Sequence, residues 1–238
     1  MPPHDLEHIR QARSQAISVA SAVSLYGLSF GALAVISGFS VWQTMVLSLF
    51  MFSGASQFAF VGVIASGGMA AGWAAVASAG LLGVRNGLYS LRMSPIVGPG
   101  WLKRLTAAQL TVDESTAVGS GQSSLVGNKT GFWWTAILLY SGWNAMTLVG
   151  ALLGDVLGDV RTWGLDAAAA AAFLGLLWPR LNRGEPIAVG LGSGVLTVVL
   201  VPVLPAGVPL VIAAAVTIVV ALYRHRVAPE RPPREEVS

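Results

Sequence analysis

The chain has 238 residues, of which 54% are hydrophobic and only 11% are charged, and its formal net charge is +3. Soluble domains carry about a quarter charged residues, so this composition predicts an integral membrane protein and leaves no room for a sizeable soluble module. The sequence has no cysteine, which excludes disulfides, thiolate catalysis and cysteine-based metal sites. The arginines lie mostly between apolar runs, which indicates membrane orientation and not binding to nucleic acid.

The first long feature is a run without charge. Residues 1–13 form a polar arm, and from Ser14 to Val84 there is no Asp, Glu, Lys, Arg or His. Each crossing of a bilayer needs about 20 apolar residues, so this run predicts about three spans joined by tight turns. Gly and Ser residues divide it into helices at about 16–36, 41–65 and 69–91.

The character changes after these spans. Pro95, Pro99 and Gly100 break the helix, and residues 101–124 mix apolar positions with both basic and acidic ones. This composition is too polar for a simple span. It favours an amphipathic or re-entrant segment.

Four more apolar helices are predicted in the second half, at about 132–153, 165–178, 187–201 and 208–223. The tail at 225–238 is polar and rich in proline. We therefore predict an all-α integral membrane protein, a polytopic bundle of six or seven transmembrane helices with a mixed central segment. A single permease domain at 14–224 lies between the polar arm and the tail.

The positions of the basic residues conflict with three full crossings between Ser14 and Val84, because basic residues favour the cytoplasmic side. Arg10 and Arg13 favour a cytoplasmic N-terminus, but three crossings would then place the three basic residues between 92 and 104 outside the cell. Some segment must fail to cross. The candidates are the mixed segment at 104–125 and the short helix at 165–178.

Small residues recur at the spacing that brings membrane helices into close contact. Gly27 and Gly31 are four residues apart, and so are Gly150 and Gly154. Such pairs let two helix backbones approach each other. We expect ordinary helix packing at both places.

The most specific local string surrounds Ser53 and Gln57, which are four residues apart and share a helix face. If Ser53-Gly54 breaks the helix, free backbone groups appear at membrane depth, and together with Ser56 and the Gln57 amide they would hold a zwitterion. The alternative is that Gln57 only joins helices by a hydrogen bond. Aromatic residues in this part of the chain are candidates for an apolar pocket wall: Phe30, Phe52 and Phe58.

Charged residues within or beside the spans are further candidates. Arg85 either reaches lipid headgroups or faces inward to pair with an acidic group. Asp113 and Glu114 are candidates for ion pairing or proton relay, unless they belong to a solvated loop. Asp166 opens the helix at 165–178 and is either part of such a relay or simply its N-cap.

Five strings occur in a fixed order along the chain: Gly54–Ala59 (GASQFA), residues 83–90, Asp113–Ser115 (DES), a helix with Trp143, Thr147 and Gly150, and Gly164–Asp166 (GLD). This order resembles the AzlC family over about residues 15–225. The resemblance implies a multi-spanning permease of the cytoplasmic membrane, the large subunit of exporters of valine, leucine and isoleucine. It also implies a small AzlD-like membrane partner and no cofactor.

The resemblance implies functional roles for six residues of this chain: Gln57, Arg85, Tyr89, Asp113, Glu114 and Asp166. We expect the first three to bind the substrate, with Arg85 offsetting its carboxylate or that of an acidic side chain, and the last three to form ion pairs or to relay protons. Two positions depart from the family pattern, because Gly83 and Asn86 stand where that pattern has Asn and His. An asparagine donates hydrogen bonds but does not titrate near neutral pH. The departure therefore bears on ion coupling and on substrate choice.

Enzymatic alternatives lack the necessary groups. The sequence has no histidine between His8 and His225, so Ser53 and Ser56 have no base to activate them. The string Gly127-Asn128-Lys129-Thr130 does not meet the spacing of a phosphate-binding loop. We therefore predict a secondary transporter and no enzyme. A non-transporting assembly subunit and a channel for small solutes stay open as alternatives.

Overall fold

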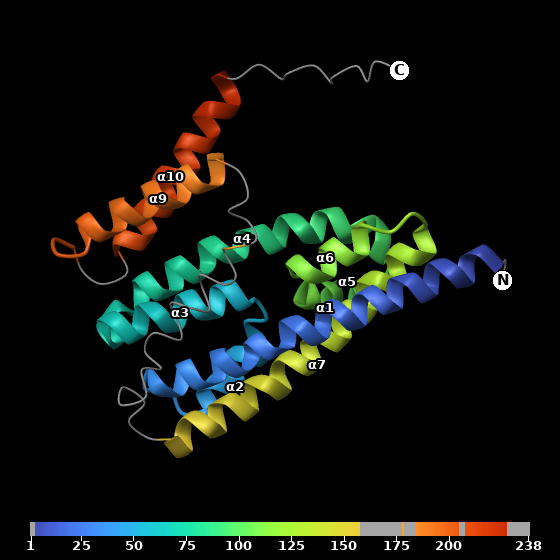
Figure 1. Cartoon of the computed structure of the whole chain (residues 1–238), viewed down its shortest axis with the longest axis horizontal. Coiled ribbons are helices and arrows are strands. Elements are labelled where there is room, and N and C mark those ends of the chain that lie inside the picture. The colour runs from blue at the N-terminus through green and yellow to red at the C-terminus, as the bar shows by residue number, and fades with distance from the viewer. Residues whose placement is uncertain (1–2, 158–177, 179–183, 205–207, 228–238) are drawn as a thin grey trace.

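The computed structural model describes residues 3–157, 178, 184–204 and 208–227 (Figure 1). This part of the chain is helical and contains no strand, which confirms the all-α class. Its elements are α1 (Pro3–Ile36), α2 (Val41–Phe50), α3 (Gly54–Gly67), η1 (Met69–Ala71), α4 (Gly72–Val97), α5 (Trp101–Leu110), α6 (Asp113–Ser120), α7 (Leu125–Leu157), α9 (Gly184–Leu200) and α10 (Val208–Val227).

Two of the described helices are long and apolar enough, by length and composition, to cross a membrane: His4–Ile36 and Leu125–Val156. Shorter apolar helices accompany them, α2, α3 and parts of α9 and α10. These helices indicate a membrane protein. The total of six or seven spans stays a prediction.

Helices α1 and α7 pack against each other along their length and run in the same direction (Figure 1). Gly27 lies against Trp143, where an added Cβ would come within 2.6 Å of the carbonyl oxygen, and Gly31 lies against the Thr147 backbone. Only glycine lets the two backbones come this close. The predicted packing role of the small residues is confirmed.

The predicted single span at 41–65 is wrong, because the helix breaks at Met51–Ser53 and turns back. At about 1.5 Å per residue, α2 and α3 are about 15 and 21 Å long. Phe39, just before α2, packs on Phe60 in α3, with ring centroids 6.1 Å apart. The two helices therefore form a hairpin. Its open end, where α2 begins and α3 ends, lies near the end of α1. Its tip, the break at Met51–Ser53, lies inside the bundle.

Helix α4 returns toward the end of the bundle where α1 begins (Figure 1). It continues past Pro95 to Val97, six residues beyond the predicted end.

The mixed segment that follows is a second hairpin, made of α5 and α6. Ala107 of α5 packs in one cluster with Phe132, and Gly119 of α6 also lies against Phe132. Thus α6 turns back after α5 and packs mainly on α7.

The boundaries at both ends of the chain differ from the sequence-based ones. Helix α1 starts at Pro3, so most of the expected polar arm is a helical extension. Gln15 and His8 hold it to the α6–α7 connection, through hydrogen bonds to Gln122 (2.8 Å) and Ser123 (3.2 Å). Helix α10 extends to Val227. The helix predicted at 165–178 lies outside the described residues except for Trp178.

Candidate functional site

The break between α2 and α3 exposes the carbonyl groups at the end of α2, and side chains from other helices bind them. The Gln109 amide of α5 donates to the Leu49 oxygen at 3.0 Å, and the Tyr140 hydroxyl of α7 donates to the same oxygen at 3.2 Å. The Gln57 amide of α3 donates to the Met51 oxygen at 2.8 Å. These bonds satisfy carbonyls that a helix end leaves without intrahelical partners.

Gln57 uses both ends of its amide group inside the protein. Its side chain is fully buried, and its Oε1 accepts a hydrogen bond of 3.0 Å from Nε1 of Trp143. Its Nε2 donates to Met51, as described above. The structure thus shows the helix-joining arrangement for Gln57, and a ligand would reach this amide only by displacing one of these bonds.

The start of α3, on the other side of the break, has no comparable cap. The first intrahelical bond runs from the Gln57 N–H to the Ser53 oxygen at 2.9 Å. The Ser53 side chain does not cap the helix, and its hydroxyl donates instead to Ser56 Oγ at 3.1 Å. The N–H groups of residues 54–56 therefore have no acceptor among the described residues. They form the positive end of the helix dipole.

Glycine is required at the first position of this helix. An added Cβ at Gly54 would lie 2.9 Å from the Trp143 ring. The indole thus covers one side of the helix start and also bonds to Gln57. This contact fixes the direction in which the N–H groups of α3 point.

A cavity of about 390 Å³ lies beside the break, a size typical of small-molecule sites. Ser53 and Ser56 line it from the first hairpin, Thr111 from the second, and Gly83 and Asn86 from the middle of α4. An added Cβ at Gly83 would be 3.7 Å from Ser56 Oγ. The missing side chain therefore adds to the space in front of α3.

The cavity has apolar walls, and Asn86, which lines it, brings a buried acceptor close to it. Phe52, Val76 and Ala79 supply apolar surface. The Oδ1 atom of Asn86 is buried and accepts no hydrogen bond within the described part of the chain. A buried polar atom in this condition is costly unless a ligand or water satisfies it.

Two of the phenylalanines named from the sequence do not line the cavity. Phe30 and Phe58 are completely buried in the core, where their rings pack against each other with centroids 5.7 Å apart. Both also pack on the Trp143 ring, at 6.4 and 6.5 Å. They support the wall behind the break, and Phe52 alone of the three reaches the cavity.

Arg85 faces inward and pairs with an acidic side chain. Its Nη1 lies 2.9 Å from Oδ2 of Asp113, the first residue of α6, and both side chains are mostly buried. Glu114 follows Asp113, and Tyr89 lies one turn beyond Arg85 on α4; both are half-buried. Asp166 lies outside the described residues.

Sequence patterns did not identify the residues that bind the end of α2. Gln109 and Tyr140 are 60 and 91 residues away from Leu49 in the chain, so local spacing does not connect them with the break. Trp143 belongs to one of the strings quoted above, but nothing there links its indole to Gln57. Among the described residues, no group of His, Asp and Glu is arranged to hold a metal ion.

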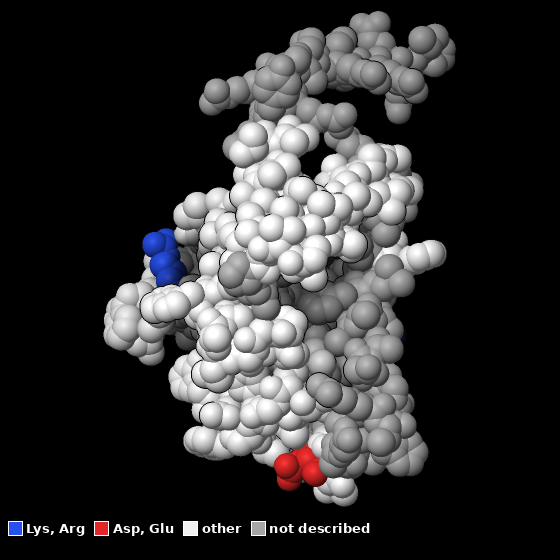
Figure 2. All heavy atoms as spheres, turned by 90° about the vertical axis from the view of Figure 1, so that its left-hand side faces the viewer, with Lys and Arg blue, Asp and Glu red and all other residues white. Residues whose placement is uncertain are grey.

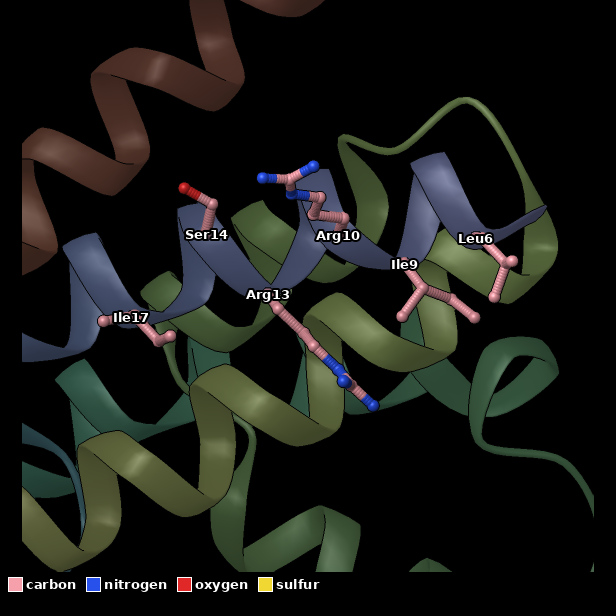
Figure 3. A pocket seen from close by; sticks show the side chains of 6 residues that line it. All are labelled: Leu6, Ile9, Arg10, Arg13, Ser14 and Ile17. Atoms are coloured by element: carbon pink, nitrogen blue, oxygen red, sulfur yellow. The ribbon is translucent and has the colours of Figure 1, made fainter. Parts of the chain in front are cut away.

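A second cavity of about 440 Å³ lies on the N-terminal part of α1 (Figure 3). It is a surface groove along a single helix, lined by Leu6, Ile9, Arg10, Arg13, Ser14 and Ile17. The Arg13 guanidinium lies 4.6 Å from the centroid of the Trp134 ring. No residue of this groove is shared with the cavity at the break.

Comparison with known proteins identifies one family. The model of the family described as "AzlC protein" matches residues 18–157, which is more than half of the chain. No curated protein and no solved structure matches the chain. The matched region includes both hairpins, the break and every described residue that lines the cavity.

Proposed function

Because the chain belongs to the AzlC family, a family associated with membrane transport, we propose that it is the large subunit of a secondary exporter of branched-chain amino acids. The substrates are valine, leucine and isoleucine. The protein works in the cytoplasmic membrane together with a small AzlD-like membrane subunit. The observation that carries this proposal is the cavity, in which an uncapped helix start lies near a buried acceptor and apolar walls.

The substrate carboxylate binds at the start of α3. The N–H groups of residues 54–56 and the hydroxyl of Ser53 or Ser56 donate to it, and the helix dipole favours its negative charge. A broken helix inside a membrane protein commonly holds the charged group of a substrate in this way.

The substrate ammonium group binds at Asn86, whose Oδ1 lacks a hydrogen-bond donor in the described residues. Gln57, which the sequence predicted as a ligand, does not touch the substrate in this proposal. It holds the end of α2 and the Trp143 indole in place through its two hydrogen bonds. The aliphatic side chain packs on Phe52, Val76 and Ala79. Since one methylene changes binding by about 1–3 kcal/mol, selectivity among the three substrates is loose.

Both members of the Arg85–Asp113 pair are close in the chain to residues that line the cavity, because Arg85 precedes Asn86 and Asp113 follows Thr111 by two residues. We assign ion coupling to this pair together with Glu114 and Asp166, and Tyr89, one turn beyond Arg85 on α4, stays a predicted substrate ligand. The chain lacks an ATP-binding string, so the driving force is an ion gradient or the gradient of the substrate itself. Proton exchange at a carboxylate fits the first possibility.

The test is valine efflux from loaded cells that express the chain with its partner subunit. Asn86→Leu keeps the size of the side chain and removes the acceptor. We expect efflux to fall by about tenfold or more, the equivalent of one lost hydrogen bond to a charged group. The control is Ser66→Ala, at the open end of the first hairpin, which should leave efflux unchanged because Ser66 bonds only to Val63.

Three results would count against the proposal. Unchanged efflux in Asn86→Leu, at normal protein abundance, contradicts the assigned site. Efflux that does not depend on the chain at all favours an assembly subunit. Efflux that shows neither saturation nor counterflow favours a channel.

A further inference from the structure

The first 120 residues contain two units with the same plan. In each, a long helix ends in a turn with a glycine at positive φ, either Gly38 (φ 92°) or Gly98 (φ 82°). A helix of ten residues follows, α2 in the first unit and α5 in the second. Each unit then has a short break and a helix that turns back, α3 or α6. The order α1–α2–α3 is thus repeated by α4–α5–α6.

The two breaks also agree in detail. The residue that precedes each returning helix is extended: Ser53 has φ −157° and ψ 101°, and Val112 has φ −132° and ψ 177°. A buried serine occupies the third position of each helix. Ser56 bonds to Ser53 Oγ at 3.1 Å, and Ser115 Oγ accepts from the Val112 N–H at 3.0 Å.

The two hairpins open at opposite ends of the bundle (Figure 1). The contact between Phe39 and Phe60 places the open end of α2–α3 where α1 ends. The α5–α6 hairpin opens where α1 begins, because Ser123 just after it bonds to His8 at 3.2 Å. Long helices α1 and α4 likewise run in opposite directions (Figure 1).

The tips of the two hairpins meet inside the bundle. Gln109, near the tip of the second hairpin, donates to the Leu49 oxygen at the tip of the first. Leu110 and Val112 share one buried cluster with Phe52. The cavity at the break is lined by both tips. In lipid, interrupted helices are tolerated only where protein or a water-filled cavity surrounds them, and both breaks meet this condition.

Charge separates the two ends of the bundle. Every lysine and arginine of residues 3–157 except Arg85 lies toward the end where α1 begins: Arg10, Arg13, Arg92, Lys103, Arg104 and Lys129. Figure 2 faces the left-hand side of Figure 1, where α1 ends, and its described surface is mostly uncharged, with one basic and one acidic patch. Excess Lys and Arg mark the cytoplasmic side of a membrane protein.

We propose that α1–α2–α3 and α4–α5–α6 are two inverted copies of one unit, and that their hairpins enter the membrane from opposite sides and meet at mid-depth. The α2–α3 hairpin enters from outside the cell, and α5–α6 enters from the cytoplasm. Helix α4 crosses between them, since its 26 residues reach about 39 Å, beyond the roughly 30 Å of hydrocarbon.

This arrangement resolves the conflict found in the sequence, where three crossings before residue 92 would place the basic residues at 92–104 outside the cell. The turned-back segment that places residues 92–104 on the same side as the N-terminus is 41–67. The α5–α6 hairpin also turns back, as the sequence suggested for 104–125, and the helix suspected at 165–178 lies outside the described residues. With residues 41–67 turned back, the N-terminus and the basic residues Arg92, Lys103, Arg104 and Lys129 lie on the same, cytoplasmic side. Inverted repeats with a site between broken helices are a recurring plan of secondary transporters.

Single introduced cysteines test the arrangement, because the native chain has none. Ser40→Cys and Met69→Cys mark the open end of the first hairpin, and Lys103→Cys and Ser123→Cys mark that of the second. With a membrane-impermeant maleimide, positions 40 and 69 should react in intact cells, and positions 103 and 123 only after permeabilisation. The exposed Trp73 and Trp101 replace any position whose variant is not produced.

Two labelling results would overturn the proposal. Labelling of positions 40 and 69 from opposite sides means that residues 41–67 cross the membrane. Labelling of positions 69 and 103 from the same side means that α4 does not. Neither result depends on which solute the protein transports, so this test is separate from the efflux assay.

Crosslinking tests the contact between the tips. A Phe50→Cys/Gln109→Cys pair in membranes should be joined by a short, flexible bifunctional thiol reagent, because the Gln109 amide reaches the Phe50 oxygen at 3.2 Å. The matched control, Trp73→Cys/Gln109→Cys, should not. A crosslink in the control alone, or in neither pair, contradicts the meeting of the tips.

Discussion

Two helices begin inside the bundle, α3 and α6, and their first residues differ in charge. Helix α6 starts with Asp113 and Glu114, and Asp113 is paired with Arg85 at 2.9 Å. Helix α3 starts with Gly54 and contains no charged residue in its first turn. Both starts lie at the tip of a hairpin, and each follows an extended residue.

The difference shows which tip is available to a ligand. The dipole of α6 meets the chain's own carboxylates, which stabilise its positive end. The corresponding end of α3 has no acidic residue, and its N–H groups lie beside the cavity. Similar backbone geometry therefore serves internal structure at one tip and, as we propose, substrate binding at the other.

The sharpest test makes the start of α3 resemble that of α6. Ser53→Asp places a carboxylate at the N-cap, where it occupies the N–H groups meant for the substrate. We expect valine efflux to fall by more than about tenfold while thermal stability in detergent is kept, because Asp caps helices as well as Ser or better. Ser53→Ala, which removes the hydroxyl but leaves the N–H groups open, is the matched variant and should lose less efflux than Ser53→Asp. Equal efflux in both variants would refute the comparison.

The opposite change removes the cation beside α6. Arg85→Ala leaves Asp113 without its ion-pair partner in a mostly buried place, and we expect a loss of about 1–3 kcal/mol in stability. The measurement is protein abundance and melting temperature in detergent. The double variant Arg85→Gln/Asp113→Asn keeps the pair neutral and should recover much of the stability. No recovery would mean that the arginine acts through packing and not through charge.

We expect a smaller loss of stability and of efflux from substitutions of Gln57, whose amide binds both the end of α2 and Trp143. Gln57→Ala leaves the Trp143 N–H and the Met51 oxygen buried without this partner, at a cost of about 1–2 kcal/mol. Gln57→Glu keeps an acceptor for the indole but no longer donates to Met51. If Gln57 positions the site, the maximal efflux rate should fall in both variants, and more in Ala. A change confined to substrate affinity would instead make Gln57 a direct ligand.

The smallest expected effect concerns space in front of α3. Gly83→Val fills part of the cavity next to Ser56, so the half-saturating concentration should rise about two- to fivefold more for leucine than for alanine, less than the roughly tenfold or more of a whole methylene. Gly87→Val is the matched control, since Gly87 lies one turn further along α4 with nothing near its Cβ position. A control as impaired as Gly83→Val would show an effect on the helix and not on the cavity.

The composition predicted that the protein lies in a membrane, and the spacing of small residues predicted where two of its helices pack. The uncharged run from Ser14 to Val84 identified a membrane protein, and the glycine spacing identified the faces of α1 and α7. The Ser53-Gly54 string marked the break correctly. It did not show that α3 turns back, because residues 41–65 have the length and apolar character of a full span. The direction is set by contacts far apart in the chain, such as Phe39 with Phe60 and Gln109 with Leu49.

The contact between α1 and α7 has a consequence for how the protein moves. At Gly27, Gly31 and Gly150 the two backbones touch so closely that neither helix is able to slide or rotate past the other without a clash. The pair therefore acts as a fixed frame for the rest of the bundle. A change of shape that passes a solute from one side of the membrane to the other then comes from elements outside this pair, α4 and the hairpins among them, moving against the frame.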